Sequence, residues 1–208
     1  MRPAPGLAEM DSKEGVEMRE IPAESLSGPG ASPPPFRLAY WVDPLRLMAG
    51  CYPGHGDPRI AERQLGALLD CGIRCFLSLM EEDARGPFIP YEPLLKEIAA
   101  RRGIAIECLR FEIEDHSAPS CEQMGEIERA MAKSMAAGRP VYLHCWGGRG
   151  RTGAVVGVYL VRRGMATTEN FVDVIAELRS GATGESPETE EQTEFVRSFL
   201  ADSGNSPP

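Results

Sequence analysis

The sequence lacks any apolar segment as long as the roughly 20 residues that a membrane-spanning helix needs. Its beginning, MRPAPGLAEMDSKEG, also lacks the apolar stretch of a secretory signal peptide. Histidine is scarce, with only His55, His116 and His144, and no C-x-x-C pair occurs. These absences argue against membrane insertion and against a metal centre, and they predict a cytoplasmic protein without a metal or other cofactor.

The six cysteines lack the context of a disulfide framework, because no secretion signal accompanies them. They are expected to be free thiols, most of them small buried core residues. As an alternative role, Cys71 or Cys75 could form a disulfide with Cys145 after Cys145 is oxidised.

Hydrophobic residues make up 42% of the 208 positions and charged residues 25%, which suits one globular domain. Residues 1–35 are rich in Pro, Gly, Ser and Glu and end in SGPGASPPP. Such a composition buries too little apolar surface to order itself. We therefore expect a disordered N-terminal tail at 1–35, a domain at 36–202, and a disordered C-terminal tail at 203–208.

The net charge of −9 argues against general binding of nucleic acid or of anionic membranes. The charge is unevenly distributed, however, because the window from Arg129 to Thr168 contains seven Lys and Arg residues and no Asp or Glu. A basic run is often a solvated face. Because this window contains the glycine-rich loop described below, we favour a local anion site on an acidic protein.

Apolar periodicity and turn residues divide the domain into alternating strands and helices. This alternation predicts an α/β fold with a central, mostly parallel sheet flanked by helices. Strands are expected at 45–50, 73–80, 104–114 and 140–145, and helices at 57–72, 91–103, 120–137, 152–163, 167–180 and 188–201.

The segment VYLHCWGGRGRTGAVVGVYLVRRG places a glycine-rich loop between a predicted strand and a predicted helix. In an α/β sheet, ligands bind beyond the carboxyl ends of the strands, where a helix N-terminus points its N–H groups. Gly147, Gly148 and Gly150 let the backbone curl into an anion nest. Arg151, six residues after Cys145, adds a planar guanidinium that can hold two phosphate oxygens.

The same loop favours ionisation of Cys145, because helix N-termini and nearby cations stabilise a thiolate. The thiolate is the nucleophilic form of cysteine. Among the six cysteines, only Cys145 follows a histidine and has an arginine six residues on. One loop thus combines a site for a dianion with an attacking sulfur, which predicts chemistry at phosphorus.

The stretch HCWGGRGRTG resembles the HC-x5-R-[ST] signature of cysteine-dependent protein tyrosine phosphatases, in their compact dual-specificity branch. The resemblance covers roughly residues 37–200. It implies the fold of that family, a phosphocysteine intermediate and no metal. It also implies that Cys145 attacks phosphorus, Arg151 holds the phosphoryl oxygens, Thr152 hydrogen-bonds the sulfur, and His144 orients the loop without acting as a catalyst.

The resemblance also implies a general acid some thirty residues before the cysteine. Asp115 stands thirty positions before Cys145 in FEIEDHSAPS, and the D-x-x-x-P-S pattern matches the family. It would protonate the leaving oxygen and then serve as the base toward water. Glu114 and Asp83 remain alternatives. Gln192 matches a residue that positions the hydrolytic water in some relatives, although a solvated helix residue is an equal alternative.

Two loop residues bear on the substrate. Trp146 follows the nucleophile and either forms a wall of the pocket or packs against the domain. Arg149 adds a second cation where the phosphoinositide-phosphatase branch also carries a basic residue. The implied substrate is a phosphorylated protein, with phosphotyrosine or dual specificity, and a soluble inositol phosphate or a phosphoinositide is the alternative. The predicted substrate-binding residues are Trp146, Gly147, Gly148, Arg149, Gly150 and Arg151.

Two rival interpretations come from other classes of protein. GRGRTG also fits the dinucleotide pattern G-x-G-x-x-G, with Asp173 twenty residues after the end of that pattern. This interpretation fails because Asp173 lies in a predicted helix instead of ending a strand, and because it leaves Cys145 unexplained. A catalytically inactive phosphate-binding module remains the second alternative. The sequence leaves the oligomeric state open.

Overall fold

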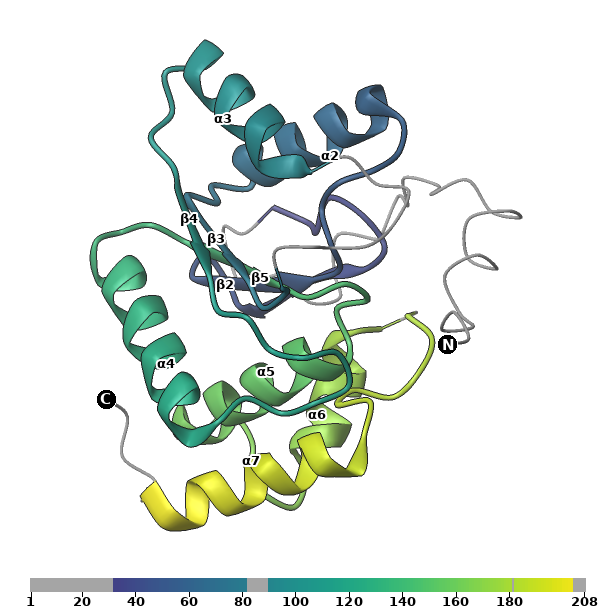
Figure 1. The fold of residues 1–208 in the computed structure, drawn as a ribbon, viewed down its shortest axis with the longest axis vertical. Coiled ribbons are helices and arrows are strands. Elements are labelled where there is room, and N and C mark those ends of the chain that lie inside the picture. Colours follow the sequence, from purple (N-terminus) through teal and green to yellow (C-terminus); the bar gives the residue numbers. More distant parts are fainter. Residues whose placement is uncertain (1–31, 82–89, 181, 204–208) are drawn as a thin grey trace.

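The computed structural model describes residues 32–81, 90–180 and 182–203 (Figure 1). The predicted tails at 1–35 and 203–208 lie almost entirely outside these ranges. Ser32 already contacts the domain, since its carbonyl oxygen accepts a hydrogen bond of 2.7 Å from Nε1 of Trp41. None of the described helices combines the length and the apolarity that crossing a membrane requires.

The described part of the chain contains a five-stranded sheet with the strand order β1-β2-β5-β3-β4. Strands β2, β5, β3 and β4 run parallel, and β1 pairs antiparallel with β2 at one edge. This arrangement confirms the expected α/β fold with a mostly parallel sheet. The strands are β1 (Ala39–Asp43), β2 (Leu47–Gly50), β3 (Cys75–Ser78), β4 (Glu107–Arg110) and β5 (Val141–His144).

Strand β1 was not predicted from the sequence, and β4 is shorter than the strand predicted at 104–114. Strand β1 is fixed by its pairing with β2, in which Ala39 lies opposite Gly50. The expected strand at 104–114 ends at Arg110. The residues after Arg110 therefore belong to the loop that carries Asp115, which leaves that loop longer than predicted.

Helices cover both faces of the sheet (Figure 1). Two lie on one face and four on the other, each group over its own hydrophobic cluster. The first group is α2 (Pro58–Asp70) and α3 (Tyr91–Arg101). The second is α4 (Cys121–Ala136), α5 (Gly150–Arg162), α6 (Phe171–Leu178) and α7 (Glu190–Ser203).

Local signals begin two of these helices. Asp57 accepts a hydrogen bond from the backbone N of Arg59 at 2.8 Å, just before α2. Ser120 and Gln123 form a capping box at the start of α4, with hydrogen bonds of 3.1 and 3.2 Å. Both starts agree with the predicted ones.

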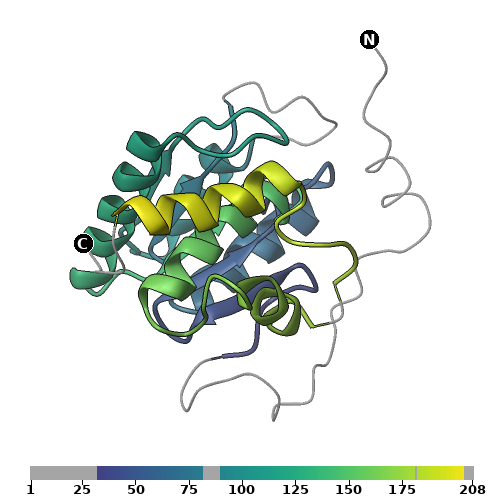
Figure 2. The same cartoon turned by 90° about the horizontal axis from the view of Figure 1, so that it is seen from below.

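Helix α5 is the central helix of its layer and is buried from Gly150 to Val161. Helix α7 lies across it on the outside, as Figure 2 shows. The close approach of α6 and α7 to α5 depends on Gly157. A Cβ atom at this position would lie 2.8 Å from the ring of Phe171 in α6 and 3.3 Å from Val196 in α7. The packing of α7 on α5 brings the C-terminal part of the chain to the loop after β5.

Candidate active site

The loop after β5 is anchored against the end of β2. Cys145 is buried directly after His144, the last residue of β5. Gly148 has a φ of +66°, and a Cβ there would lie 2.4 to 2.6 Å from backbone atoms of Gly50 and Cys51. Only glycine fits this conformation and this contact, so Gly148 lets the loop after β5 pack directly against the end of β2.

His144 holds the cysteine from behind. Burial lowers the pKa of His144 to about 4, so the imidazole is neutral near pH 7. Its Nδ1 lies 3.1 Å from the carbonyl oxygen of Cys145 and therefore donates. Its Nε2 then accepts from the hydroxyl of Tyr91 at 2.9 Å. These two contacts fix the ring and the carbonyl group behind the loop.

Arg151 and Asp115 meet at the start of α5. The Arg151 guanidinium donates from Nη1 to the carbonyl oxygen of Ile113 at 3.1 Å and from Nη2 to Oδ1 of Asp115 at 2.7 Å. Arg151 is buried, whereas 62% of the Asp115 side chain is exposed. The structure therefore brings the predicted phosphate ligand and the predicted acid into direct contact. The rival Glu114 is exposed next to Asp115, and Asp83 lies outside the described residues.

Thr152 is fully buried in the first turn of α5. Its hydroxyl has no hydrogen-bond partner among the described residues. A buried hydroxyl without a partner costs about 1–3 kcal/mol. Thr152 thus keeps a donor that is not used elsewhere in the described structure, as its predicted role requires.

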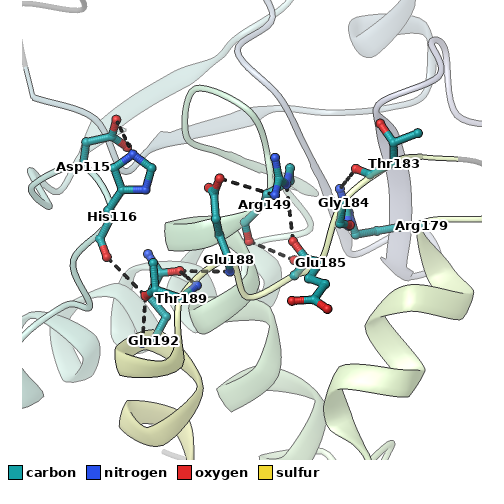
Figure 3. A network of polar contacts seen from close by, with 11 residues as sticks. Asp115, His116, Arg149, Arg179, Thr183, Gly184, Glu185, Glu188, Thr189 and Gln192 are labelled. Atoms are coloured by element: carbon teal, nitrogen blue, oxygen red, sulfur yellow. Dashed lines mark hydrogen bonds and ion pairs between the residues drawn. The ribbon is translucent and has the colours of Figure 1, made fainter. Parts of the chain in front are cut away.

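Gln192 is completely buried, so the alternative that it is a solvated helix residue is wrong. Its Nε2 donates to the carbonyl oxygen of Ser117 at 3.0 Å, two residues after Asp115. Thr189 donates from Oγ1 to the carbonyl oxygen of His116 at 3.3 Å. Figure 3 shows Thr189 and Gln192 beneath the Asp115–His116 segment.

Arg149 points toward the segment before α7 (Figure 3). Its Nη2 lies 3.3 Å from Oε1 of Glu188, and its Nε donates to the carbonyl oxygen of Glu185 at 3.3 Å. A Cβ on Gly184 would lie 2.6 to 2.8 Å from the guanidinium. The second predicted cation of the loop is therefore paired with a carboxylate.

Trp146 packs against Tyr52, with ring centroids 5.3 Å apart and planes tilted by 34°. The backbone N of Tyr52 also donates to the carbonyl oxygen of Trp146 at 2.9 Å. These contacts agree with the expectation that Trp146 packs against the domain, and a role as a wall of the pocket stays a prediction. Because Trp146 directly follows Cys145, the Tyr52–Trp146 pair adjoins the loop.

The sequence analysis missed Arg179, a buried residue directly after α6. Its Nη1 donates to the carbonyl oxygen of Gly184 at 2.7 Å, which is the glycine that packs against Arg149. Burial lowers the pKa of Arg179. Arg179 lies outside the window from Arg129 to Thr168 that contains no Asp or Glu, and it belongs to none of the sequence motifs. Its position beside the candidate site is therefore evident only from the fold.

All six cysteines are free thiols, as predicted. Burial raises the pKa of Cys51 to about 12 and the pKa of Cys71 and Cys108 to about 11. These thiols stay protonated near neutral pH, whereas Cys121 is exposed. Within the described ranges, no group of three or more His, Cys, Asp and Glu side chains is arranged to hold a metal ion.

Residues 53–165 match the family model described as "Tc-R-P: Polymorphic toxin system, DSP-PTPase phosphatase". The matched part includes Asp115, Cys145 and Arg151. The chain belongs to this DSP-PTPase phosphatase family. The resemblance to cysteine-dependent protein tyrosine phosphatases of the dual-specificity branch is thereby confirmed.

Solved structures agree with this membership. The crystal structure of Tk-PTP in the active form is 26% identical in sequence to this chain, with a TM-score of 0.61, and the match covers 78% of this chain and 96% of Tk-PTP. The structure of PTPMT1 in complex with PI(5)P is 21% identical, with a TM-score of 0.57, and covers 80% of this chain and 99% of PTPMT1. The second likeness shows the fold alone.

Among curated proteins, this chain is 35% identical over 95 residues to the uncharacterized protein MJECL20 of Methanocaldococcus jannaschii. The match covers 46% of this chain and 60% of the relative. The chain therefore spans about three fifths of the length of the curated relative it matches.

Proposed function

We propose that this chain hydrolyses phosphomonoesters through a phosphocysteine intermediate and without a metal ion. The observation that carries the proposal is the contact of 2.7 Å between Arg151 and Asp115, beside the loop of Cys145. Membership of the DSP-PTPase family supports it.

In the first step, the thiolate of Cys145 attacks phosphorus, and the bond from phosphorus to the leaving oxygen breaks. Arg151 and the backbone N–H groups of the loop hold the phosphoryl oxygens as charge shifts. The incoming phosphate competes with Asp115 for Nη2 of Arg151. Asp115, in its protonated form, then gives its proton to the leaving oxygen.

In the second step, water attacks phosphorus, and the bond from phosphorus to the sulfur of Cys145 breaks. The Asp115 carboxylate takes a proton from the water and returns to its starting form. The sulfur leaves as a thiolate, stabilised by the N-terminus of α5 and by the hydroxyl of Thr152. Inorganic phosphate is the product.

The substrate we propose is a phosphorylated protein, with phosphotyrosine and dual specificity included. The ion pair of Arg149 with Glu188 supports a substrate with one phosphate group, since the second cation of the loop already has a counter-ion. An inositol phosphate or phosphoinositide is the second candidate. It is favoured by the position of Arg149 in the loop and by the likeness of fold to PTPMT1, whose structure contains PI(5)P. The cytoplasmic location stays a prediction.

The test is turnover of p-nitrophenyl phosphate by the wild type in the presence of EDTA, compared with Cys145→Ser. We expect turnover by the wild type and its loss in the variant. A chain that binds a phosphopeptide without turnover would be the inactive module instead. Peptides with phosphotyrosine, phosphoserine or phosphothreonine, compared with inositol phosphates, then identify the substrate class.

Alkylation gives an independent test of the nucleophile. Iodoacetate should modify Cys145 much faster than the exposed Cys121 at neutral pH, because the loop stabilises the thiolate. Prior addition of inorganic phosphate should slow the reaction at Cys145 only. Equal rates at the two positions would contradict the proposed role of the loop.

A further inference from the structure

Two side chains at the start of α7 hold the loop that carries Asp115. Thr189 donates to the carbonyl oxygen of His116, and Gln192 donates to the carbonyl oxygen of Ser117. The acceptors are the first and second residues after Asp115, and their partners stand 73 and 75 positions further along the chain. Figure 3 shows Thr189 directly below the carbonyl group of His116, with Gln192 beneath Thr189.

The carboxamide of Gln192 is fully occupied on its oxygen. Oε1 accepts hydrogen bonds from the backbone N of Glu188 at 3.1 Å and of Thr189 at 3.2 Å. A carbonyl oxygen has two lone pairs, so none remains for a hydrogen of the attacking water. This occupancy favours a role for Gln192 other than accepting a hydrogen bond from that water.

Gln192 also touches the phosphate-binding loop. A Cβ on Gly150 would lie 2.8 Å from both Nε2 and Oε1 of Gln192. One buried side chain thus contacts the first residue of α5 and the carbonyl group of Ser117. It links the loop of Cys145 directly to the loop of Asp115.

The loop of Asp115 contains a residue in an unfavourable conformation. His116 has a φ of +65°, in the left-handed region that residues other than glycine rarely adopt. Such a conformation persists only where surrounding contacts fix it. The carbonyl oxygen of His116 itself is the acceptor of Thr189, so the residue directly before α7 supplies one of those contacts.

We propose that Thr189 and Gln192 are positioning residues that hold the loop of Asp115 so that Asp115 stays in contact with Arg151. This inference rests on the proposed function, because it assigns a purpose to the acid role of Asp115. The carboxylate is largely exposed and has few contacts of its own. Its position is therefore set by the backbone of residues 116 and 117, which Thr189 and Gln192 hold.

The experiment measures kcat for phosphotyrosine and for p-nitrophenyl phosphate in Thr189→Val and Gln192→Met. A mispositioned acid slows the poorer leaving group more, because p-nitrophenolate needs less protonation. We expect kcat for phosphotyrosine to fall by about 10-fold more than kcat for p-nitrophenyl phosphate. This loss is a fraction of the roughly 10²–10⁴-fold that general acid catalysis contributes to a rate. Thr193→Val, the same change one turn after Thr189 and inside α7, should leave the ratio of the two kcat values unchanged.

A double-mutant cycle separates positioning from a merely structural role. In the Asp115→Ala background, Thr189→Val should cause no further loss of kcat for phosphotyrosine, because the acid it positions is gone. Additive losses, or equal losses on both substrates, would overturn the proposal. A burst of p-nitrophenol followed by slow turnover in Gln192→Met, but not in Asp115→Ala or Thr189→Val, would also overturn it, because that result places Gln192 in the hydrolysis step independently of Asp115.

The same measurements distinguish a failure of the acid role of Asp115 from a failure of the positioning role of Thr189 and Gln192. If Asp115→Ala shows no difference between the substrates, the acid assignment fails and the positioning role fails with it. If Asp115→Ala shows the difference and Thr189→Val does not, only the positioning role fails. Thermal melting of each variant identifies any loss of folding, and Thr189→Val still decides the matter if Gln192→Met does not fold.

Discussion

Arg151 donates a hydrogen bond of 2.7 Å to Oδ1 of Asp115, although the two residues are 36 positions apart. Only 6% of the Arg151 side chain is exposed, against 62% for Asp115. The buried guanidinium is held in place by the carbonyl oxygen of Ile113, whereas the carboxylate faces solvent, where a substrate arrives. One contact thus joins the group proposed to bind phosphate with the group proposed to move the proton.

Replacing Arg151 with lysine should lower kcat/KM for p-nitrophenyl phosphate by about 100-fold or more. An ammonium group cannot donate to two phosphoryl oxygens in one plane, and it cannot reach both Ile113 and Asp115 in the same way. Steady-state kinetics measures the effect. Arg197→Lys, an exposed arginine of α7, is the matched control and should leave kcat/KM unchanged. Near-normal activity of Arg151→Lys would refute the role of the guanidinium.

Asp115→Ala should slow the hydrolysis of phosphotyrosine by about 100-fold and that of p-nitrophenyl phosphate much less. The reason is the greater need of the tyrosine oxygen for a proton. Comparing kcat for the two substrates measures the difference. Glu114→Gln removes the neighbouring carboxylate and should leave the ratio unchanged. If Glu114→Gln shows the selective loss instead, the acid is Glu114.

Gly148→Ala should destabilise the protein by about 2 kcal/mol or more and abolish activity. The added Cβ meets the backbone of Gly50 and Cys51 at 2.4 to 2.6 Å, and the φ of +66° disfavours any residue other than glycine. Urea unfolding measures the free energy of unfolding. Gly147→Ala is the matched control, because its Cβ would have no neighbour within 4 Å and its φ is not positive. Equal stability of the two variants would contradict this account of the loop.

The free energy of unfolding should decrease as the pH is lowered from 6.5 toward 4, because His144 is buried in its neutral form. Burial lowers its pKa from 6.5 to about 4, so between these values the unfolded state binds a proton that the native state does not. The contribution of His144 is fully present above pH 6.5 and is lost at about 1.4 kcal/mol per pH unit as the pH falls toward 4.

His144→Asn tests this dependence. The asparagine cannot titrate, and its amide can still donate to the carbonyl oxygen of Cys145. Urea unfolding at several pH values between 4 and 7 should give a shallower slope for the variant than for the wild type. Identical slopes would mean that the burial of neutral His144 does not control the acid limb of stability.

Local patterns of residues were enough to identify the candidate nucleophile and the class of fold. Cys145, the glycines and Arg151 lie within one short segment between a strand and a helix, so their spacing alone places them in one loop. The alternation of strands and helices likewise determined the α/β class, because apolar periodicity is a local property. Strand β1 escaped notice, because its pairing with β2 and not its own pattern defines it.

The distant residues of the candidate site, in contrast, could be identified only from the packing of the folded chain. Asp115 and Glu114 are adjacent and chemically alike, and the contact with Arg151 distinguishes them. The burial of Gln192 and the pairing of Arg149 with Glu188 depend on α7 packing across α5. Such contacts join segments tens of residues apart, and their formation depends on the summed packing of whole helices, which no local pattern of residues records.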